Sequence, residues 1–326
     1  MGVVPVRGLE CSWGSYGGWY TNLLATARLC VDDTGMIKII RQWISRAVAL
    51  ALIGPVAASV SEGLSAVDGS GAHTLLTGDS LVSGLIALVI VGVLTGIAGI
   101  VGGVLGGRRE GFLAMGFVLG WVAWTSGRIG QVYSLTPEIG TSIRLAMEAL
   151  GIGACVLITG VIVSTKDEDD PISSFSPNRL VGWVKQGPML SAMGAALLVA
   201  GVVAMFLGTY DFPGQSTGVG FFAGIFGGVA GSMVAVSMNE KDGHEGTPFA
   251  PVMIGVLLAG AVFPAVTIVY PGFASMQELV LEGALPGFVI VSPAAWAMGA
   301  LLGVPIGHSW VEHSHEKAHH GATASK

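Results

Sequence analysis

Charged residues are scarce in this sequence. The 326 residues include 15 Lys and Arg and 21 Asp and Glu, which is 11% of the chain, whereas soluble domains carry about 25% charged residues. The mean hydropathy is +0.72, so most of the chain suits a hydrocarbon solvent, and we expect the lipid bilayer to be its main partner. The charges form no basic stripe, which argues against nucleic acid as a partner.

Cysteines and catalytic motifs are scarce as well. Cys11, Cys30 and Cys155 have neither the spacing of metal ligands nor that of a disulfide framework. The sequence contains no P-loop, no G-x-S-x-G elbow and no convincing dinucleotide-binding fingerprint. No histidine falls inside a predicted membrane span, which argues against haem ligation there. These absences favour a protein that is not an enzyme.

Long apolar runs fill most of the chain instead. A helix needs roughly 20 mostly apolar residues to cross the bilayer core, and eight segments meet or approach that length. Runs of this length indicate helices rather than barrel strands, because backbone groups in lipid must be satisfied internally. The prediction is an all-α polytopic membrane protein with about eight transmembrane helices, at residues 43–61, 80–105, 111–127, 141–164, 188–208, 217–238, 250–270 and 285–307.

The first 35 residues differ from the rest. They show neither helical nor strand periodicity, and Met36 then opens a segment in which Lys38, Arg41 and Arg46 precede an apolar run. Such a segment is typical of a signal sequence or a first membrane helix. We hypothesise that Met36 is the biological start and that residues 1–35 are a non-structured extension. Small residues at 56–58 also fit a cleaved signal peptide, which would leave seven spans; a retained helix is the preferred interpretation.

Positive residues gather on alternate connections between the predicted spans. If the N-terminus is cytoplasmic, the outer side holds only Arg128 and Arg144. The inner side then holds the other positive residues from Met36 onward: Lys38, Arg41, Arg46, Arg108, Arg109, Lys166, Arg179, Lys185, Lys241, Lys317 and Lys326. By the positive-inside rule, both termini are predicted to be cytoplasmic, in a cell membrane.

Two glycine-rich stretches resemble each other, "GIVGGVLG" at 99–106 and "GIFGGVAG" at 224–231. Each lies in the second helix of a four-helix group. This suggests two parallel four-helix halves, 36–164 and 188–307, with a polar cytoplasmic linker at 165–187 and a His-rich tail at 308–326. A chance match between glycine-rich helices is the alternative.

Within each stretch the glycines recur at i, i+3, i+4 and i+7, which places them on one helix face. A face without side chains lets another backbone approach closely. Tight helix packing is the preferred interpretation, and a smooth wall beside a solute path is the alternative. The glycines concerned are Gly99, Gly102, Gly103, Gly106, Gly224, Gly227, Gly228 and Gly231.

Charged residues and prolines inside the spans are candidates for function. Arg144 and Glu148 share a helix face near the outer end of the fourth span, and a charge at membrane depth costs on the order of 2.5–3.5 kcal/mol. A structural ion pair and a gate or solute-binding pair both remain open, with Arg128 as a third member. Pro264 and Pro293 each remove a backbone hydrogen bond, so they mark candidate helix breaks of the kind that frame transporter sites.

The tail spells the zinc-protease pattern H-E-x-x-H at 315–319. In a helix, His308, Glu312, His315 and His319 fall along one stripe that suits a divalent metal ion. The segment is polar, follows the last span and has no scaffold behind it, which disfavours a protease. A solvated tail and a metal-binding tail stay open, and no other cofactor is predicted.

Three functions follow from these features. The leading one is a transporter or channel-like protein for a small solute or ion, with Arg144, Glu148 and Arg128 at its path or gate. The second is a non-catalytic subunit or scaffold of a membrane complex, with other membrane subunits or a homo-oligomer as partners. A metal-dependent membrane enzyme is a remote third. Because the spans contain few polar residues, the subunit or scaffold function stays an alternative.

Overall fold

The computed structural model describes residues 35–126, 128–164, 187–209, 212, 214–242, 249–269 and 273–324. Within these ranges the regular structure is helical, without a strand. The chain divides into two compact units, Met1–Ile40 and Arg41–Lys326. Cys11, Cys30 and residues 165–186 of the predicted linker lie outside the described residues.

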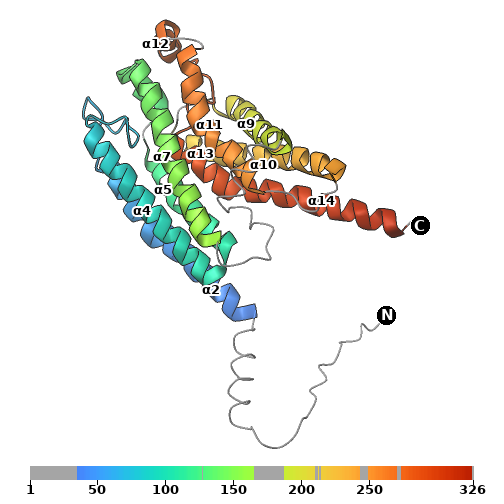
Figure 1. Cartoon of the computed structure of the whole chain (residues 1–326). Coiled ribbons are helices and arrows are strands. Elements are labelled where there is room, and N and C mark those ends of the chain that lie inside the picture. The colour runs from blue at the N-terminus through green and yellow to red at the C-terminus, as the bar shows by residue number, and fades with distance from the viewer. Residues whose placement is uncertain are drawn as a thin grey trace, which may run out of the picture. The chain divides into compact units, whose positions relative to one another are not determined.

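Six helices of the described chain are long and apolar enough to cross a membrane. They are α2, η1 and α3 read as one segment (Gly35–Val48, Ala49–Ile53 and Gly54–Glu62), α4 (Leu81–Gly106), α7 (Ile139–Ser164), α9 (Gly187–Leu207), α10 (Gln215–Asp242) and α11 (Phe249–Val269). Figure 1 shows their arrangement. The remaining elements are α5 (Arg108–Thr125), α6 (Ile129–Leu135), α12 (Phe273–Glu282), α13 (Pro293–Met298), η3 (Gly299–Gly303) and α14 (Val304–Ala324).

These helices support the predicted class of a multi-pass membrane protein, but not the count of eight spans. The predicted third span, 111–127, corresponds to α5. α5 and α6 are bent by 47° relative to each other, and they add a seventh candidate span only if the pair is one span. The predicted eighth span, 285–307, is not one helix, because 284–292 is non-helical and α13 begins at Pro293. Proline has no backbone N–H to give to a preceding turn, so the first helical turn is where it fits.

The two π-helical segments have a common local cause. η1 comes directly before Gly54-Pro55, and η3 comes directly before Val304-Pro305. A proline inside a helix cannot donate to the carbonyl four residues earlier, and its ring crowds that carbonyl. Widening the preceding turn is one way to relieve this, and such bulges are a common source of helix irregularity. In η1 the Gly54 N–H bonds the carbonyl of Ala49 five residues earlier, and the carbonyl of Leu50 accepts a 2.8 Å hydrogen bond from the Trp121 indole.

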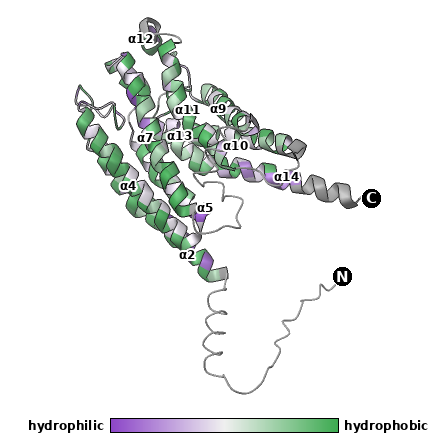
Figure 2. Ribbon diagram, in the orientation of Figure 1, coloured by the Kyte–Doolittle hydropathy of each residue, from purple (hydrophilic) through white to green (hydrophobic). Residues whose placement is uncertain are grey.

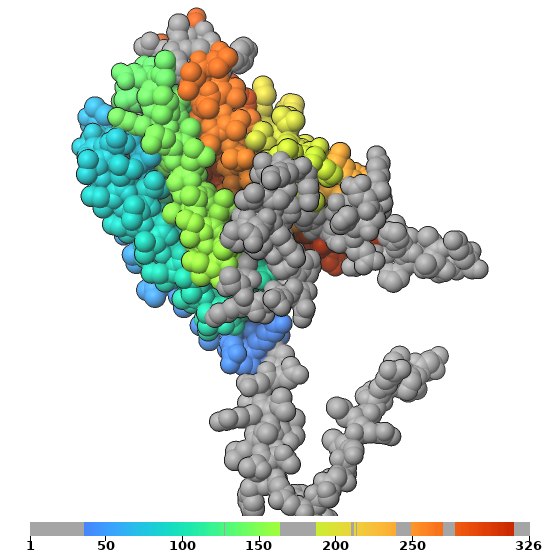
Figure 3. Space-filling view, viewed as in Figure 1, coloured from blue at the N-terminus to red at the C-terminus, as the bar shows by residue number. Residues whose placement is uncertain are grey.

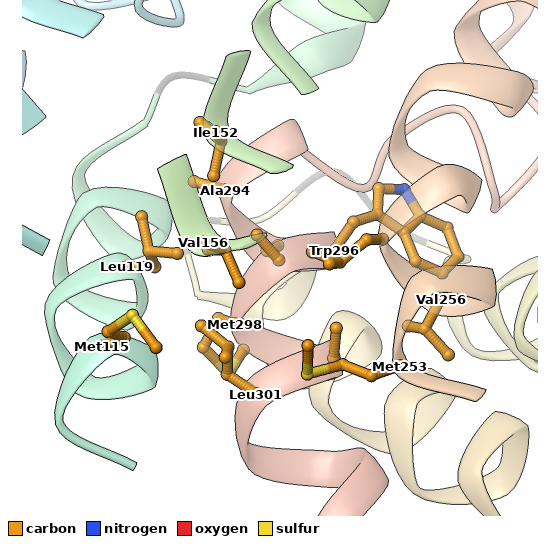
Figure 4. Packing of buried hydrophobic residues seen from close by; sticks show 14 of the residues in the cluster. Met115, Leu119, Ile152, Val156, Met253, Val256, Ala294, Trp296, Met298 and Leu301 are labelled. Atoms are coloured by element: carbon orange, nitrogen blue, oxygen red, sulfur yellow. The ribbon is translucent and has the colours of Figure 1, made fainter. Parts of the chain in front are cut away.

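The centre of the second unit is built around α13 and η3. Residues 293–301 are all buried, and α13 contacts α5, α7, α10 and α11. Figure 4 shows Trp296, Met298 and Leu301 from this segment beside apolar side chains of the surrounding helices. Residues 293–301 therefore form the middle of the core rather than an outer span.

The lipid-facing surface is apolar. Hydrophobic colour runs along α4 and α7 in Figure 2, and α4 exposes large apolar side chains along its length, including Val82, Ile86, Val89 and Val93. Extensive exposed apolar surface of this kind indicates a non-aqueous surrounding. α4 and α7 pack side by side, as Figure 3 also shows.

Candidate functional site

The connection between α3 and α4 turns back into the bundle. Residues 72–78 are all buried, because the side chains of Leu75 and Leu76 pack inward and are almost completely covered. Gly84 of α4 permits this approach: a Cβ at that position would lie 3.3 Å from the Cα of Leu76. We call residues 72–78 the inserted loop.

The inserted loop forms hydrogen bonds with Glu148 of α7. The Thr74 hydroxyl donates a 2.6 Å hydrogen bond to Oε2 of Glu148, and the backbone N–H of Leu76 donates a 2.9 Å bond to the same oxygen. Oε1 of Glu148 is also buried and has no hydrogen-bond partner among the described protein atoms. Glu148 is nine residues into α7, which is roughly 14 Å along the helix axis. A fully buried carboxyl group thus sits well inside a candidate span.

The inserted loop is also held by its own polar groups. Thr77 Oγ1 accepts a 2.7 Å hydrogen bond from the backbone N–H of Thr74. Nε2 of His73 lies 2.9 Å from the carbonyl oxygen of Ser61 at the end of α3. A carbonyl oxygen only accepts, so Nε2 carries a hydrogen, and Nδ1 is buried without a partner in the described chain. Thr74, Thr77 and His73 had no role in the sequence prediction.

Arg144 and Arg128 are placed differently from Glu148. Arg144 is half-buried on α7, and no hydrogen bond or ion pair between described residues joins it to Glu148. Arg128 is exposed directly before α6 and lines a pocket of about 380 Å³ together with Gln131, Ser134 and Thr209. The carboxyl of Glu148 is therefore bonded by the inserted loop rather than by the arginines that the sequence suggested.

A cluster of buried hydroxyl groups joins α6, α7 and α11. Tyr133 Oη lies 2.9 Å from Ser142 Oγ, which lies 2.8 Å from Thr267 Oγ1. Thr267 also lies 2.6 Å from the carbonyl oxygen of Pro264 and can donate to it. Pro264 is inside α11, and the helix continues through it, so α11 is not interrupted at this candidate break.

Two charged contacts lie in other parts of the second unit. Nε of Arg46 donates a 2.9 Å hydrogen bond to the buried Glu110 carboxylate, and its Nη2 bonds the other oxygen. On α14, Nε2 of His308 lies 3.1 Å from Glu312, and Nδ1 lies 2.9 Å from Ser232 of α10. The hydrogen bond to His308 outweighs partial burial and lowers the pKa of Glu312.

The predicted metal stripe on the tail is described only in part. His308 and Glu312 are in contact, whereas the side chain of His319 lies outside the described residues. Among the side chains that are described, no group of three His, Cys, Asp or Glu is placed to hold a metal ion. The metal site on the tail, which includes His315, stays a prediction.

The eight predicted glycines lie where neighbouring elements come close. A Cβ added at any of them would approach another atom to less than 3.0 Å. The neighbours of Gly99, Gly102, Gly103 and Gly106 include α5 and α7. Those of Gly224, Gly227, Gly228 and Gly231 belong to α9, α11, η3 and α14.

Comparison with protein-family models, with curated proteins and with solved structures finds no match for this chain. The geometry is therefore the basis for a functional proposal. The sequence held two signals for the inserted loop. One is the apolar pair Leu75-Leu76 within a polar connection, and the other is Glu148 within a predicted span, which needs donors from another part of the chain.

Proposed function

We propose that this protein is a membrane transporter or channel-like protein for a small solute or ion, with Glu148 on its path. One observation carries the proposal: the carboxyl of Glu148 is fully buried inside a candidate span, with donors on one oxygen and no partner on the other. Ionisable groups at membrane depth are costly and are characteristic of solute paths and proton relays. A purely structural carboxyl would be expected to have both oxygens satisfied.

The pocket beside α6 is the proposed entrance to this path. Its described lining includes the exposed guanidinium of Arg128 and the polar side chains of Gln131 and Ser134. Tyr133, which lies on α6 between the pocket residues Gln131 and Ser134, has its buried hydroxyl 2.9 Å from that of Ser142 on α7. Arg144, one helical turn from Glu148, is the proposed second charge of the gate.

Ion flux into liposomes tests the proposal. Purified protein is reconstituted, and the movement of H⁺, Na⁺ and K⁺ is followed with trapped fluorescent indicators. We expect flux of at least one of these ions above that of protein-free liposomes. In the variant Arg144→Gln/Glu148→Gln we expect it to fall about tenfold, which corresponds to a barrier increase of ~1.4 kcal/mol.

The matched control is Arg41→Gln/Glu138→Gln, which also removes one arginine and one glutamate but at exposed positions. It should leave the flux unchanged. Full flux in the Arg144→Gln/Glu148→Gln variant would remove both residues from the path. No flux of any of the three ions would contradict the ion-transport form of the proposal.

A non-catalytic subunit or scaffold of a membrane complex is the second candidate. The observation that favours it is the scarcity of polar groups, since α4 and α11 contain no ionisable side chain. Recovery of the protein from mild detergent only as a stoichiometric complex, together with no ion flux, would support this candidate.

We further propose that the eight glycines serve close helix packing within the chain, which is supported by the short distances that an added Cβ would make. We also propose a cell-membrane location with both termini cytoplasmic. The support for this orientation is the distribution of Lys and Arg over the connections.

A further inference from the structure

The carboxyl of Glu148 is bonded through one short stretch of chain. The donors at 2.6 and 2.9 Å, Thr74 Oγ1 and the Leu76 N–H, both belong to the inserted loop. The loop is not part of a helix, so its backbone N–H groups are available to an acceptor from outside. The strength of these hydrogen bonds therefore bears directly on how firmly the loop is held against α7.

The two oxygens of Glu148 have opposite environments. Oε2 receives two donors, at 2.6 and 2.9 Å, and such bonds are about twice as strong to a charged acceptor as to a neutral one. Oε1 is buried without a donor, which penalises a negative charge at that atom. The donors at Oε2 favour the carboxylate and the surroundings of Oε1 favour the neutral acid, so the site can exist in both states.

Few other charged or titratable groups lie around this carboxyl. α4, α11 and α13, which pack against α7, contain none. α5, which also packs against α7, carries Arg108, Arg109 and Glu110 at its opposite end. The charged or titratable groups on the two segments of the site are Arg144 and Cys155 on α7 and His73 in the inserted loop, with exposed Glu138 and Asp79 at the ends of these segments. From α6, the hydroxyl of Tyr133 contacts Ser142 of α7.

We propose that Glu148 is a proton-binding site and that its proton controls how tightly the inserted loop is held. A proton taken from water binds Oε1, converts the carboxylate to the neutral acid and breaks no covalent bond. The hydrogen bonds from Thr74 and Leu76 then lose their charge-assisted part, and the loop is released more easily from α7. Loss of the proton restores the carboxylate and holds the loop again.

This inference rests on the proposed transport function and gives it a coupling ion, H⁺. A path that opens when a buried carboxyl is protonated binds one proton for each opening, and it carries that proton across when the proton is released on the other side. The inserted loop, which lies between α3 and α4, is the segment that moves.

Amide hydrogen exchange of residues 72–78 tests the inference in the full-length protein in lipid nanodiscs. Protection factors are measured across a pH series and corrected for the intrinsic pH dependence of exchange. We expect protection of the Leu76 amide to fall about tenfold from high to low pH, which is the difference between a charge-assisted and a neutral hydrogen bond.

In Glu148→Gln, which mimics the neutral acid, protection should be low and independent of pH. The matched control is Glu110→Gln, which neutralises another buried glutamate and should keep the wild-type pH dependence in the loop. Thr74→Val removes one donor with little change of volume and should reduce protection at high pH, so it tests the same bond if Glu148→Gln fails to fold. Equal protection in wild type and Glu148→Gln, or in wild type and Thr74→Val, across the series would overturn the inference.

The hydrogen-exchange and ion-flux experiments test the two proposals separately. Flux that depends on Glu148 without any pH response of the loop would leave the transport proposal standing and remove the proton-controlled loop. A pH response of the loop without ion flux would leave the proton site standing and remove the ion-transport form of the proposed function.

Discussion

At the scale of single residues, buried charges are tolerated where donors or an opposite charge meet them. Glu110 is almost completely covered, and the guanidinium of Arg46 bonds both of its oxygens. Arg46 itself stays partly exposed and lies 5.4 Å above the ring of Trp43. Arg46 therefore loses little hydration on folding, whereas the buried carboxylate of Glu110 depends on Arg46 for its hydrogen bonds.

This asymmetry predicts that Arg46→Gln is more damaging than its exposure suggests. Removal of the arginine leaves a buried carboxylate without its partner, which should lower the free energy of unfolding by about 1.5–3 kcal/mol. The double variant Arg46→Gln/Glu110→Gln should cost less than the two single changes added together. Unfolding of the four proteins in a denaturing detergent series measures this, with Arg41→Gln as the exposed control. Additive costs would show that the two side chains do not depend on each other.

At the scale of elements, α10 and η3 approach so closely that side chains are excluded between them. A Cβ at Gly224 would collide with the backbone of Gly299, and a Cβ at Gly299 would collide with the backbone of Gly220. Without a hydrophobic driving force between helices in lipid, such backbone contact is a main source of their association.

The variant Gly224→Ala should therefore push α10 away from η3 and lower the free energy of unfolding by about 1–3 kcal/mol, as overpacking does. Gly218→Ala is the matched control, because it lies on the same helix and its added Cβ would meet nothing within 4 Å. The control should change stability by less than about 0.5 kcal/mol. Thermal unfolding in one detergent compares the two, and an equal loss in both would attribute the effect to the helix backbone rather than to packing against η3.

Elements differ in how far the sequence predicts them. The predicted spans 80–105 and 250–270 agree closely with α4 and α11, because length and apolar character alone define a spanning helix. Residues 284–292, which lie next to the core segment α13, are also apolar. Hydropathy therefore cannot distinguish this non-helical segment from a helix. The inserted loop was missed for the opposite reason. Its polar residues are typical of a surface connection, and their burial depends on tertiary bonds to Glu148 and Ser61.

At the scale of the whole molecule, the number of passes depends on the segment 284–303 once α5 and α6 are counted together as one span. The non-helical residues 284–292 and the buried α13 and η3 together lead from the end of α12 to α14. If this segment completes a crossing, seven passes separate the connection after α3 from α14, and the two lie on opposite sides of the membrane. If it enters and returns, six passes separate them, and they lie on the same side.

Cysteine labelling decides between these arrangements. Asp68→Cys and His313→Cys, both at exposed positions, are made separately in a background where the three native cysteines are Ser. With N- and C-termini cytoplasmic and eight passes, a membrane-impermeant maleimide should label Asp68→Cys in intact cells and His313→Cys only after lysis. Labelling of both variants in intact cells would show that 284–303 does not cross. Labelling of His313→Cys alone would reverse the orientation predicted from the positive residues.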